Sequence, residues 1–175
     1  ILNHMPLTYG TDIKPQWFEF YTEFKNLIIQ FFKTKQFPFY SWNLFLGNNF
    51  FASKSYYLMG DIYSYLGLLI PLQFFDVAQI LEILKFFISG WSMYYLLTCF
   101  KFNSKVKLIG AIAYTFSSWA IFFSGQLSFL SFYSWMPLYF AAIELYLRNQ
   151  KKLLFPIICA ILLFTNFYLF YTLSF

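Results

Sequence analysis

Three polar residues that could take part in chemistry lie close together in the stretch YGTDIKPQWFEFY, near the start of the chain. Asp12 is followed by Lys14 and, one helical turn after the acid, by Gln16. A carboxylate can accept a proton from a hydroxyl group or orient that group for reaction. The same acid can also simply favour the start of a helix, with Thr11 as its N-cap. The residues alone leave both interpretations open.

Three further charged side chains lie inside long apolar runs. Glu82 and Lys85 are three residues apart, and Glu144 precedes Arg148 by one helical turn. Opposite charges at these spacings on a helix are close enough to pair, which lowers the cost of burying them. We therefore expect both pairs to be neutralised. The alternative for Lys85 is that it faces the interior of a helical bundle, where it could meet a phosphate carried by a lipid.

The sequence lacks the usual motifs of soluble cofactor enzymes. It contains no GxGxxG or GxxxxGK[ST] phosphate loop, no HExxH, no CxxC and no GxSxG, and His4 is its single histidine. Cys99 and Cys159 both lie within apolar runs, so we interpret them as buried thiols. We predict no cofactor, and the sequence leaves the question of a divalent metal open.

The composition indicates lipid as the solvent that positions these residues. The 175 residues are 60% hydrophobic, 27% aromatic and only 11% charged, with a mean hydropathy of +0.58. A soluble domain carries about a quarter charged residues. We therefore predict an all-α polytopic membrane protein. Because the chain begins at Ile1 and stops within an apolar run, we interpret it as a fragment that continues at both ends.

Four apolar runs are long enough to span a bilayer, which takes about 20 helical residues. We predict transmembrane helices at 78–100, 108–125, 127–147 and 153–175. The run 63–75 is shorter and contains Gly67 and Pro71, so we interpret it as a re-entrant or interfacial segment.

Two short basic loops orient these helices. Residues 101–107 and 148–152 together hold six of the twelve basic residues and no acid. Because both loops join helices on the same side, the positive-inside rule places both in the cytoplasm and residues 1–77 outside the cell. The net charge of +5 then reflects topology, and we expect no nucleic acid as a partner.

Residues 1–77 are expected to form an extracytoplasmic loop with interfacial helices. A polar stripe recurs at spacings of three and four residues, between apolar residues that cover the rest of the helix surface; it comprises Gln16, Glu19, Glu23, Asn26, Gln30 and Lys33. We expect the apolar face of this helix to lie in lipid. Residues 37–50, with Pro38 and Gly47, are predicted to be a loop.

An ordered series of short motifs resembles the bacterial YfhO family of multi-pass membrane proteins over nearly the whole chain. The motifs are GTD (10–12), FYSWN (39–43), LGNN (46–49), SYY (55–57), AQIL (78–81), AYTFS (113–117), WMPL (135–138) and NFYLFY (166–171). That family is similar to the GT-C glycosyltransferases, so the resemblance implies a GT-C-like helix bundle. It also implies a polyprenyl-phosphate-linked sugar as donor and a cell-envelope polymer such as lipoteichoic acid as acceptor.

The resemblance assigns the catalytic carboxylate of the first extracytoplasmic loop to Asp12. The leaving phosphate then needs a cation, and Lys14, Lys54 and Lys85 are the candidates, with Gln16 as a further substrate-binding residue. One departure concerns Asp61, which stands where the family usually shows a Ser-Pro-like turn. We interpret Asp61 as a turn residue in solvent, with a second acid of the site as the alternative.

The sequence therefore predicts a glycosyltransferase in a bacterial cell membrane, with membrane lipid, the lipid-linked donor and the envelope acceptor as partners. A multi-pass transporter or lipid flippase, in which Glu82, Lys85 and Glu144 line a path, is the alternative. A membrane scaffold without chemistry is a third possibility.

Overall fold

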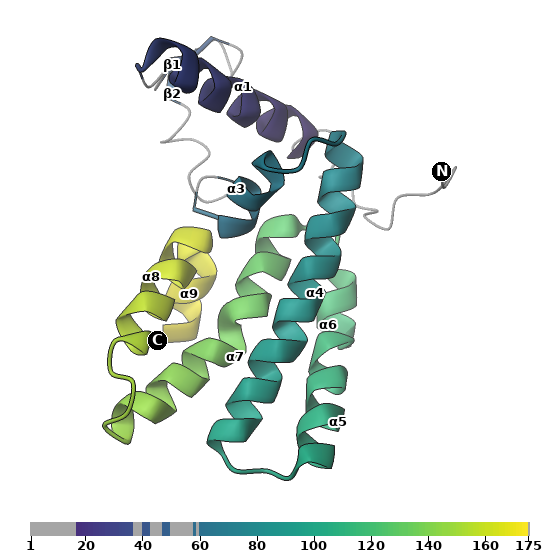
Figure 1. Ribbon diagram of the computed structural model, residues 1–175, viewed down its shortest axis with the longest axis vertical. Coiled ribbons are helices and arrows are strands. Elements are labelled where there is room, and N and C mark those ends of the chain that lie inside the picture. The colour runs from purple at the N-terminus through teal and green to yellow at the C-terminus, as the bar shows by residue number, and fades with distance from the viewer. Residues whose placement is uncertain (1–16, 37–39, 43–46, 50–57, 59, 175) are drawn as a thin grey trace.

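The computed structural model of the chain describes residues 17–36, 40–42, 47–49, 58 and 60–174. Its elements are almost entirely helical, and Figure 1 shows their arrangement. In chain order they are α1 (Glu19–Thr34), β1 (Tyr40–Ser41), β2 (Asn48–Asn49), α3 (Ile62–Leu68), α4 (Phe74–Cys99), α5 (Ser104–Thr115), α6 (Ser118–Phe122), α7 (Leu127–Leu147), α8 (Leu154–Thr165) and α9 (Phe167–Ser174). The two short strands pair antiparallel, with Tyr40 opposite Asn49.

Two long helices, α4 and α7, lie side by side at the centre of a bundle (Figure 1). Helices α5 and α6 flank α4, and the α8–α9 pair packs against α7. Helices α1 and α3 lie at the end of the bundle where α4 and α7 begin. The basic loops 101–107 and 148–152 lie at the opposite end, as the predicted crossings require. In the described part of the chain, α4 is the one helix that meets both the length and the hydropathy expected of a membrane span.

Serine side chains let α4 and α7 approach closely. Ser89 and Ser92 on α4 and Ser131 and Ser134 on α7 are fully buried. The Ser92 hydroxyl donates to the backbone carbonyl of Ser134 across the interface at 2.8 Å. Small side chains and interhelical hydrogen bonds are what hold helices together in lipid, where hydrophobic burial gives little driving force.

A proline inside α7 is accommodated by a neighbouring tyrosine. Pro137 has no N–H to donate to the carbonyl of Tyr133, four residues earlier. The hydroxyl of Tyr114 donates to that carbonyl at 2.9 Å, and the rings of Tyr114 and Tyr133 stack 4.2 Å apart. The carbonyl that the proline leaves unpaired is therefore satisfied by another helix, which a lipid surrounding requires.

Two of the four predicted spans are not continuous helices. The run 108–125 divides into α5 and α6 because Ser117 caps α6, accepting from the backbone N–H of Ala120. The run 153–175 divides at Asn166, whose side chain accepts from the N–H of Leu169. Short polar side chains compete in this way with helical hydrogen bonds, and apolar length alone does not reveal the break.

The second break reverses the chain. Phe155 on α8 and Phe170 on α9 both pack against Tyr139 of α7, with ring centroids 6.1 and 5.9 Å from it. Helices α8 and α9 therefore form a hairpin, as Figure 1 shows. The predicted span 127–147 coincides with α7, and α4 begins four residues before the predicted 78. Residues 63–73 form most of α3 and the turn after it, as the expectation of a non-spanning segment requires, and residues 74 and 75 begin α4.

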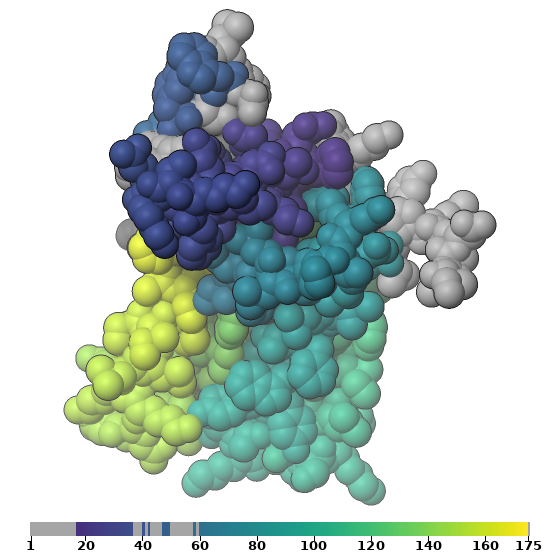
Figure 2. Space-filling view, turned by 45° about the horizontal axis from the view of Figure 1, so that its top comes forward, coloured from purple at the N-terminus to yellow at the C-terminus, as the bar shows by residue number. Residues whose placement is uncertain are grey.

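Part of the apolar face of α1 packs against protein, whereas Ile29 and Phe32 on the same helix are 43% and 64% exposed. Trp17, two residues before the helix, is buried against α3 and the start of α4, as are Tyr21, Phe24 and Leu27 on the helix itself. Figure 2 shows α1 lying over the end of the bundle. The described part of its polar stripe, from Glu19 to Lys33, faces outward, with Glu23 half-buried. The aromatic side chains find a protein surface that a single amphipathic pattern cannot distinguish from a lipid one.

Candidate functional site

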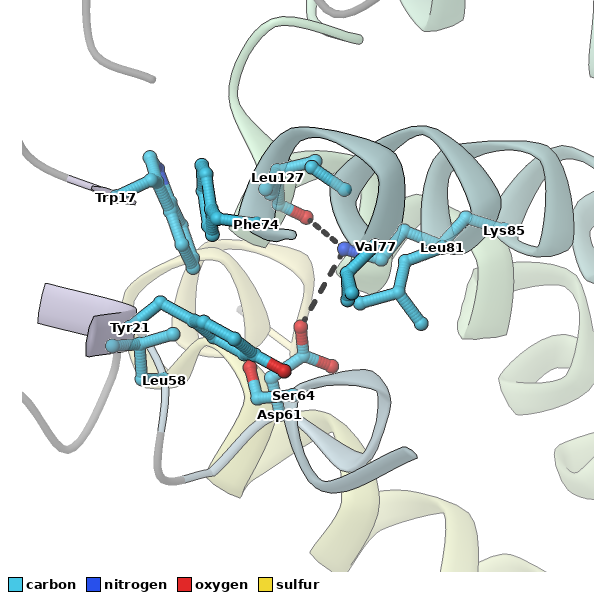
Figure 3. A pocket seen from close by; sticks show the side chains of 11 residues that line it. Trp17, Tyr21, Leu58, Asp61, Ser64, Phe74, Val77, Leu81, Lys85 and Leu127 are labelled. Carbon is cyan, nitrogen blue, oxygen red and sulfur yellow. Dashed lines mark hydrogen bonds and ion pairs between the residues drawn. The ribbon is translucent and has the colours of Figure 1, made fainter. Parts of the chain in front are cut away.

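The main cluster of buried charge is an ion pair between Asp61 and Lys85 at the α1 end of the bundle (Figure 3). Asp61 is the N-cap of α3, and its Oδ1 accepts from the N–H of Tyr63 at 3.2 Å. Lys85 extends from α4, and its Nζ lies 3.6 Å from Asp61 Oδ2. Each side chain is only 1% exposed. An N-cap position thus holds a carboxylate against a buried ammonium group.

Helix α7 supplies the remaining polar partners of the pair. Ser131 Oγ lies 2.7 Å from Asp61 Oδ2 and equally close to the carbonyl of Leu127, and its single proton can serve one acceptor at a time. Lys85 Nζ donates to that same carbonyl at 2.9 Å. The Tyr63 ring lies 5.2 Å from the ammonium, within range of a cation–π contact. Charges buried in this way are tolerated because each has several polar partners.

A small pocket, here called the Asp61 pocket, opens beside the ion pair. Its room is about 10 Å³, enough for one water molecule. It is lined mostly by apolar residues of α1, α3 and α4 and by the start of α7; they are Trp17, Tyr21, Leu58, Asp61, Ser64, Phe74, Val77, Ala78, Leu81, Lys85 and Leu127. In this form the pocket admits no sugar or phosphate.

The hydroxyl of Tyr21 points into this pocket (Figure 3). It is buried and has no hydrogen-bond partner among the described residues. Burial raises the pKa of Tyr21 to about 12, so the hydroxyl stays protonated at neutral pH. The Tyr21 hydroxyl therefore has a proton to donate, and Asp61 and Lys85 lie 3.6 Å apart, too far for a direct hydrogen bond. These features indicate that a water molecule in the pocket could bridge the three groups.

A line of hydrogen bonds connects the pocket to the middle of the bundle. The Ser134 hydroxyl donates to the carbonyl of Ser131 at 2.7 Å and lies 2.7 Å from the hydroxyl of Tyr63. Because Ser131 also contacts Asp61, the ion pair, α3 and the α4–α7 interface are joined in one network. Substitution of any member is expected to affect the others.

Glu82 does not pair with Lys85, contrary to the expectation from their spacing. It is 5% exposed, its Oε2 has no hydrogen-bond partner in the described part of the chain, and the ammonium of Lys85 is directed to Asp61 instead. The expected pair of Glu144 with Arg148 is present, at 2.6 Å. Spacing along one helix therefore identified the partner for Arg148 and missed a partner from another element for Lys85.

The predicted site residues divide into two groups. Asp12, Lys14, Gln16 and Lys54 lie outside the described residues. Asp61 and Lys85, which the sequence could not connect, are brought together.

The interpretation of Asp61 as a solvated turn residue was wrong, because α1 and α7 cover it. Ser131 and Tyr21 were missed. The spacing of Ser128, Ser131 and Ser134 on an apolar helix was the available signal for the first, whereas nothing in the sequence singled out Tyr21 from the other aromatic residues. Among the described residues, no three of His, Cys, Asp and Glu could together hold a metal ion.

Comparison with known proteins identifies the family. Neither the curated proteins nor the solved structures give a match. The family model described as bacterial membrane protein YfhO matches residues 6–175, which is nearly the entire chain. This match extends over the ion pair, the central helices and the α8–α9 hairpin. The chain therefore belongs to the YfhO family of bacterial membrane proteins.

Proposed function

We propose that the protein transfers a sugar from a polyprenyl-phosphate carrier to a cell-envelope acceptor at the extracytoplasmic face of the membrane. The observation that carries this proposal is the position of Trp17, which is 3% exposed and lines the Asp61 pocket at the end of the bundle opposite the basic loops. Asp12 precedes Trp17 by five residues, so their Cα atoms are at most about 18 Å apart. The proposal requires the Asp12 carboxylate to act at this end of the bundle.

The chemistry requires little beyond orientation, a proton acceptor and a cation. The bond between the anomeric carbon and the carrier phosphate breaks, and a new bond forms from that carbon to an acceptor hydroxyl oxygen. The Asp12 carboxylate accepts the hydroxyl proton or stabilises the positive charge that develops on the sugar. The phosphate leaves with the bonding electrons, and Lys14 or Lys54 neutralises it, with Gln16 as an orienting residue.

The Asp61–Lys85 pair has a positioning role in this scheme. Asp61 already neutralises the ammonium of Lys85, and the pocket beside them has room for only one water molecule. Lys85 is therefore a weaker candidate for binding the phosphate than the sequence suggested. The pair fixes the start of α3 against α4 and α7, and Tyr21 and Trp17 pack over it. A fixed support of this kind holds Trp17 and Tyr21 in place at this end of the bundle.

The membrane orientation supports an extracytoplasmic reaction. The two basic loops lie at one end of the bundle, and the positive-inside rule places that end in the cytoplasm. The Asp61 pocket is then at the outer face, where a lipid carrier presents its sugar to envelope polymers.

The proposal is tested by substituting Asp12→Asn in the full-length protein and measuring glycosylation of the envelope polymer in cells. We expect loss of the sugar at unchanged membrane abundance. Glu19→Gln is the matched control, because Glu19 is an exposed carboxylate seven residues later, and it should leave glycosylation intact. Normal glycosylation in the Asp12→Asn strain would remove Asp12 from the mechanism.

Broken helices favour a second candidate function, the transport of a lipid-linked molecule. Both α5–α6 and α8–α9 are interrupted, and discontinuous helices at membrane depth line binding sites in many transporters. Purified full-length protein in vesicles distinguishes the two. A transporter moves a labelled polyprenyl-phosphate lipid between leaflets without changing it, whereas the proposed enzyme releases the sugar from the carrier.

A further inference from the structure

The two basic loops meet at the end of the bundle opposite the Asp61 pocket. The guanidinium of Arg148 donates to the carbonyl of Cys99 at 3.0 Å, and Lys151 Nζ donates to the hydroxyl of Tyr95 at 3.0 Å. These bonds join the α7–α8 connection to the last turns of α4. The two loops hold six basic residues, here called the basic end: Lys101, Lys105, Lys107, Arg148, Lys151 and Lys152.

The basic end carries a large uncompensated positive charge. Within the described residues, its one ion pair joins Arg148 to Glu144 at 2.6 Å. Six basic residues less this one acid leave a formal charge of five at this end. The side chains of Lys101, Lys105 and Lys152 are exposed. A concentration of like charge on a short surface favours binding of an anion.

Aromatic side chains lie at the level of these charges. Lys107 Nζ lies 4.9 Å from the ring centroid of Tyr94, and Lys151 Nζ lies 5.4 Å from that of Tyr95. The ring of Trp91 stacks on Tyr95 at 6.1 Å. Tyrosine and tryptophan accumulate where a membrane protein crosses from hydrocarbon to headgroups. The basic end therefore lies at headgroup depth.

Large apolar side chains are exposed next to the lysines. Phe100, Phe102, Leu147 and Leu153 are between 47% and 76% exposed. A soluble anionic partner or a nucleic acid would leave these side chains in water. A phospholipid satisfies both features, because its acyl chains cover the apolar residues and its phosphate meets the lysines.

We propose that the basic end is a binding surface for anionic phospholipids, with Lys101, Lys105 and Lys152 as its principal headgroup contacts. The surface is independent of the sugar transfer proposed above, because it lies at the other end of the bundle. Bound anionic lipid holds the α4–α5 and α7–α8 connections together and fixes the depth of the bundle in the membrane. Each lysine near an anionic membrane surface contributes up to about fivefold in binding.

The test compares two triple variants of the full-length protein in neutral detergent micelles. One is Lys101→Gln/Lys105→Gln/Lys152→Gln, and the control, on α1 and its C-cap, is Lys25→Gln/Lys33→Gln/Lys35→Gln. Each lowers the formal net charge of the 175 residues from +5 by three, to +2. The measured quantity is the ratio of apparent association constants for phosphatidylglycerol and phosphatidylcholine, obtained from energy transfer between the protein's tryptophans and a fluorescent lipid.

We expect the wild type to prefer phosphatidylglycerol. The ratio of association constants should fall by at least about fivefold in the basic-end variant and stay unchanged in the α1 variant. About 1 M salt should abolish the preference of the wild type, since the Debye length is then about 3 Å. This salt titration needs no variant, so it holds even if a variant fails to fold. An equal loss in the α1 variant, an unchanged ratio in the basic-end variant, or competition by inorganic phosphate as strong as that by the lipid would each overturn the proposal.

Discussion

Substitution Lys85→Met should destabilise the protein far more than loss of an exposed charge, because it leaves a buried carboxylate without its counter-ion. At the observed 3.6 Å, the attraction between Lys85 and Asp61 is about 4–5 kcal/mol for an effective dielectric constant of about 20. The donor to the carbonyl of Leu127 is lost as well. The desolvation cost of burying the ammonium group disappears with it, which offsets part of this loss. We expect the free energy of unfolding to fall by about 3–5 kcal/mol, as for other buried pairs.

A double-mutant cycle separates the pair from other effects. Asp61→Asn should also destabilise strongly, although the amide still caps α3. The double variant should cost at least about 2 kcal/mol less than the sum of the two single variants, because neither charge is then left unpaired. The free energy of unfolding is measured by denaturation of the full-length protein in mixed detergent micelles.

The exposed pair of Arg148 with Glu144 is the internal control. Its side chains are 39% and 25% exposed, and Arg148→Met should cost less than about 1 kcal/mol. A cost below about 1 kcal/mol for Lys85→Met, or simple additivity of the Lys85 and Asp61 substitutions, would refute the reasoning that these charges depend on each other.

Three further predictions concern the surroundings of this pair. Gly60→Ala should destabilise the protein by roughly 2 kcal/mol or more, because the new Cβ meets the backbone carbonyl of Phe164. Gly110→Ala is the control and should have a mild effect, because its Cβ meets the flexible end of Leu97; the thermal midpoints of the two variants test this. Burial raises the pKa of Tyr21 from 10.0 to about 12, so between pH 10 and 12 the folded state keeps a proton that the unfolded state loses, and the free energy of unfolding should fall. Tyr21→Phe should make this fall with pH less steep, and an unchanged pH dependence would contradict the assignment. Ser131→Ala should cost about 1–3 kcal/mol by removing a hydroxyl donor from a buried carboxylate, and a neutral effect in the same unfolding assay would place Asp61 in contact with water instead.

The bundle could be predicted from the sequence where apolar length decided the outcome. The boundaries of α7 follow from Leu127 and Leu147, where the apolar run begins and ends. The breaks at Ser117 and Asn166 could not be predicted in the same way. A serine or asparagine within an apolar run can either bond within a helix or cap a new one. Contacts with α7 accompany both breaks, because the Ser117 hydroxyl lies within hydrogen-bond distance of that of Tyr133, and Phe170, which follows Asn166, packs on Tyr139.

The candidate site was predictable only in part, because it depends on contacts between distant elements. Lys85 was recognised as an unusual charge in an apolar helix, but its partner Asp61 lies 24 residues earlier and is buried by α1 and α7. Turn residues are normally solvated, so the pattern around Asp61 indicated solvent. The apolar face of α1 likewise has the same spacing whether lipid or protein covers it.

The most direct test of the central claim is a transfer assay with the purified full-length protein in vesicles. The donor is a polyprenyl-phosphate lipid with a radiolabelled sugar, and the acceptor is an envelope polymer. The proposed function predicts that label appears on the acceptor in step with release of the polyprenyl phosphate, and that Asp12→Asn abolishes both while Glu19→Gln abolishes neither. Movement of intact donor between leaflets without any transfer of label would contradict it.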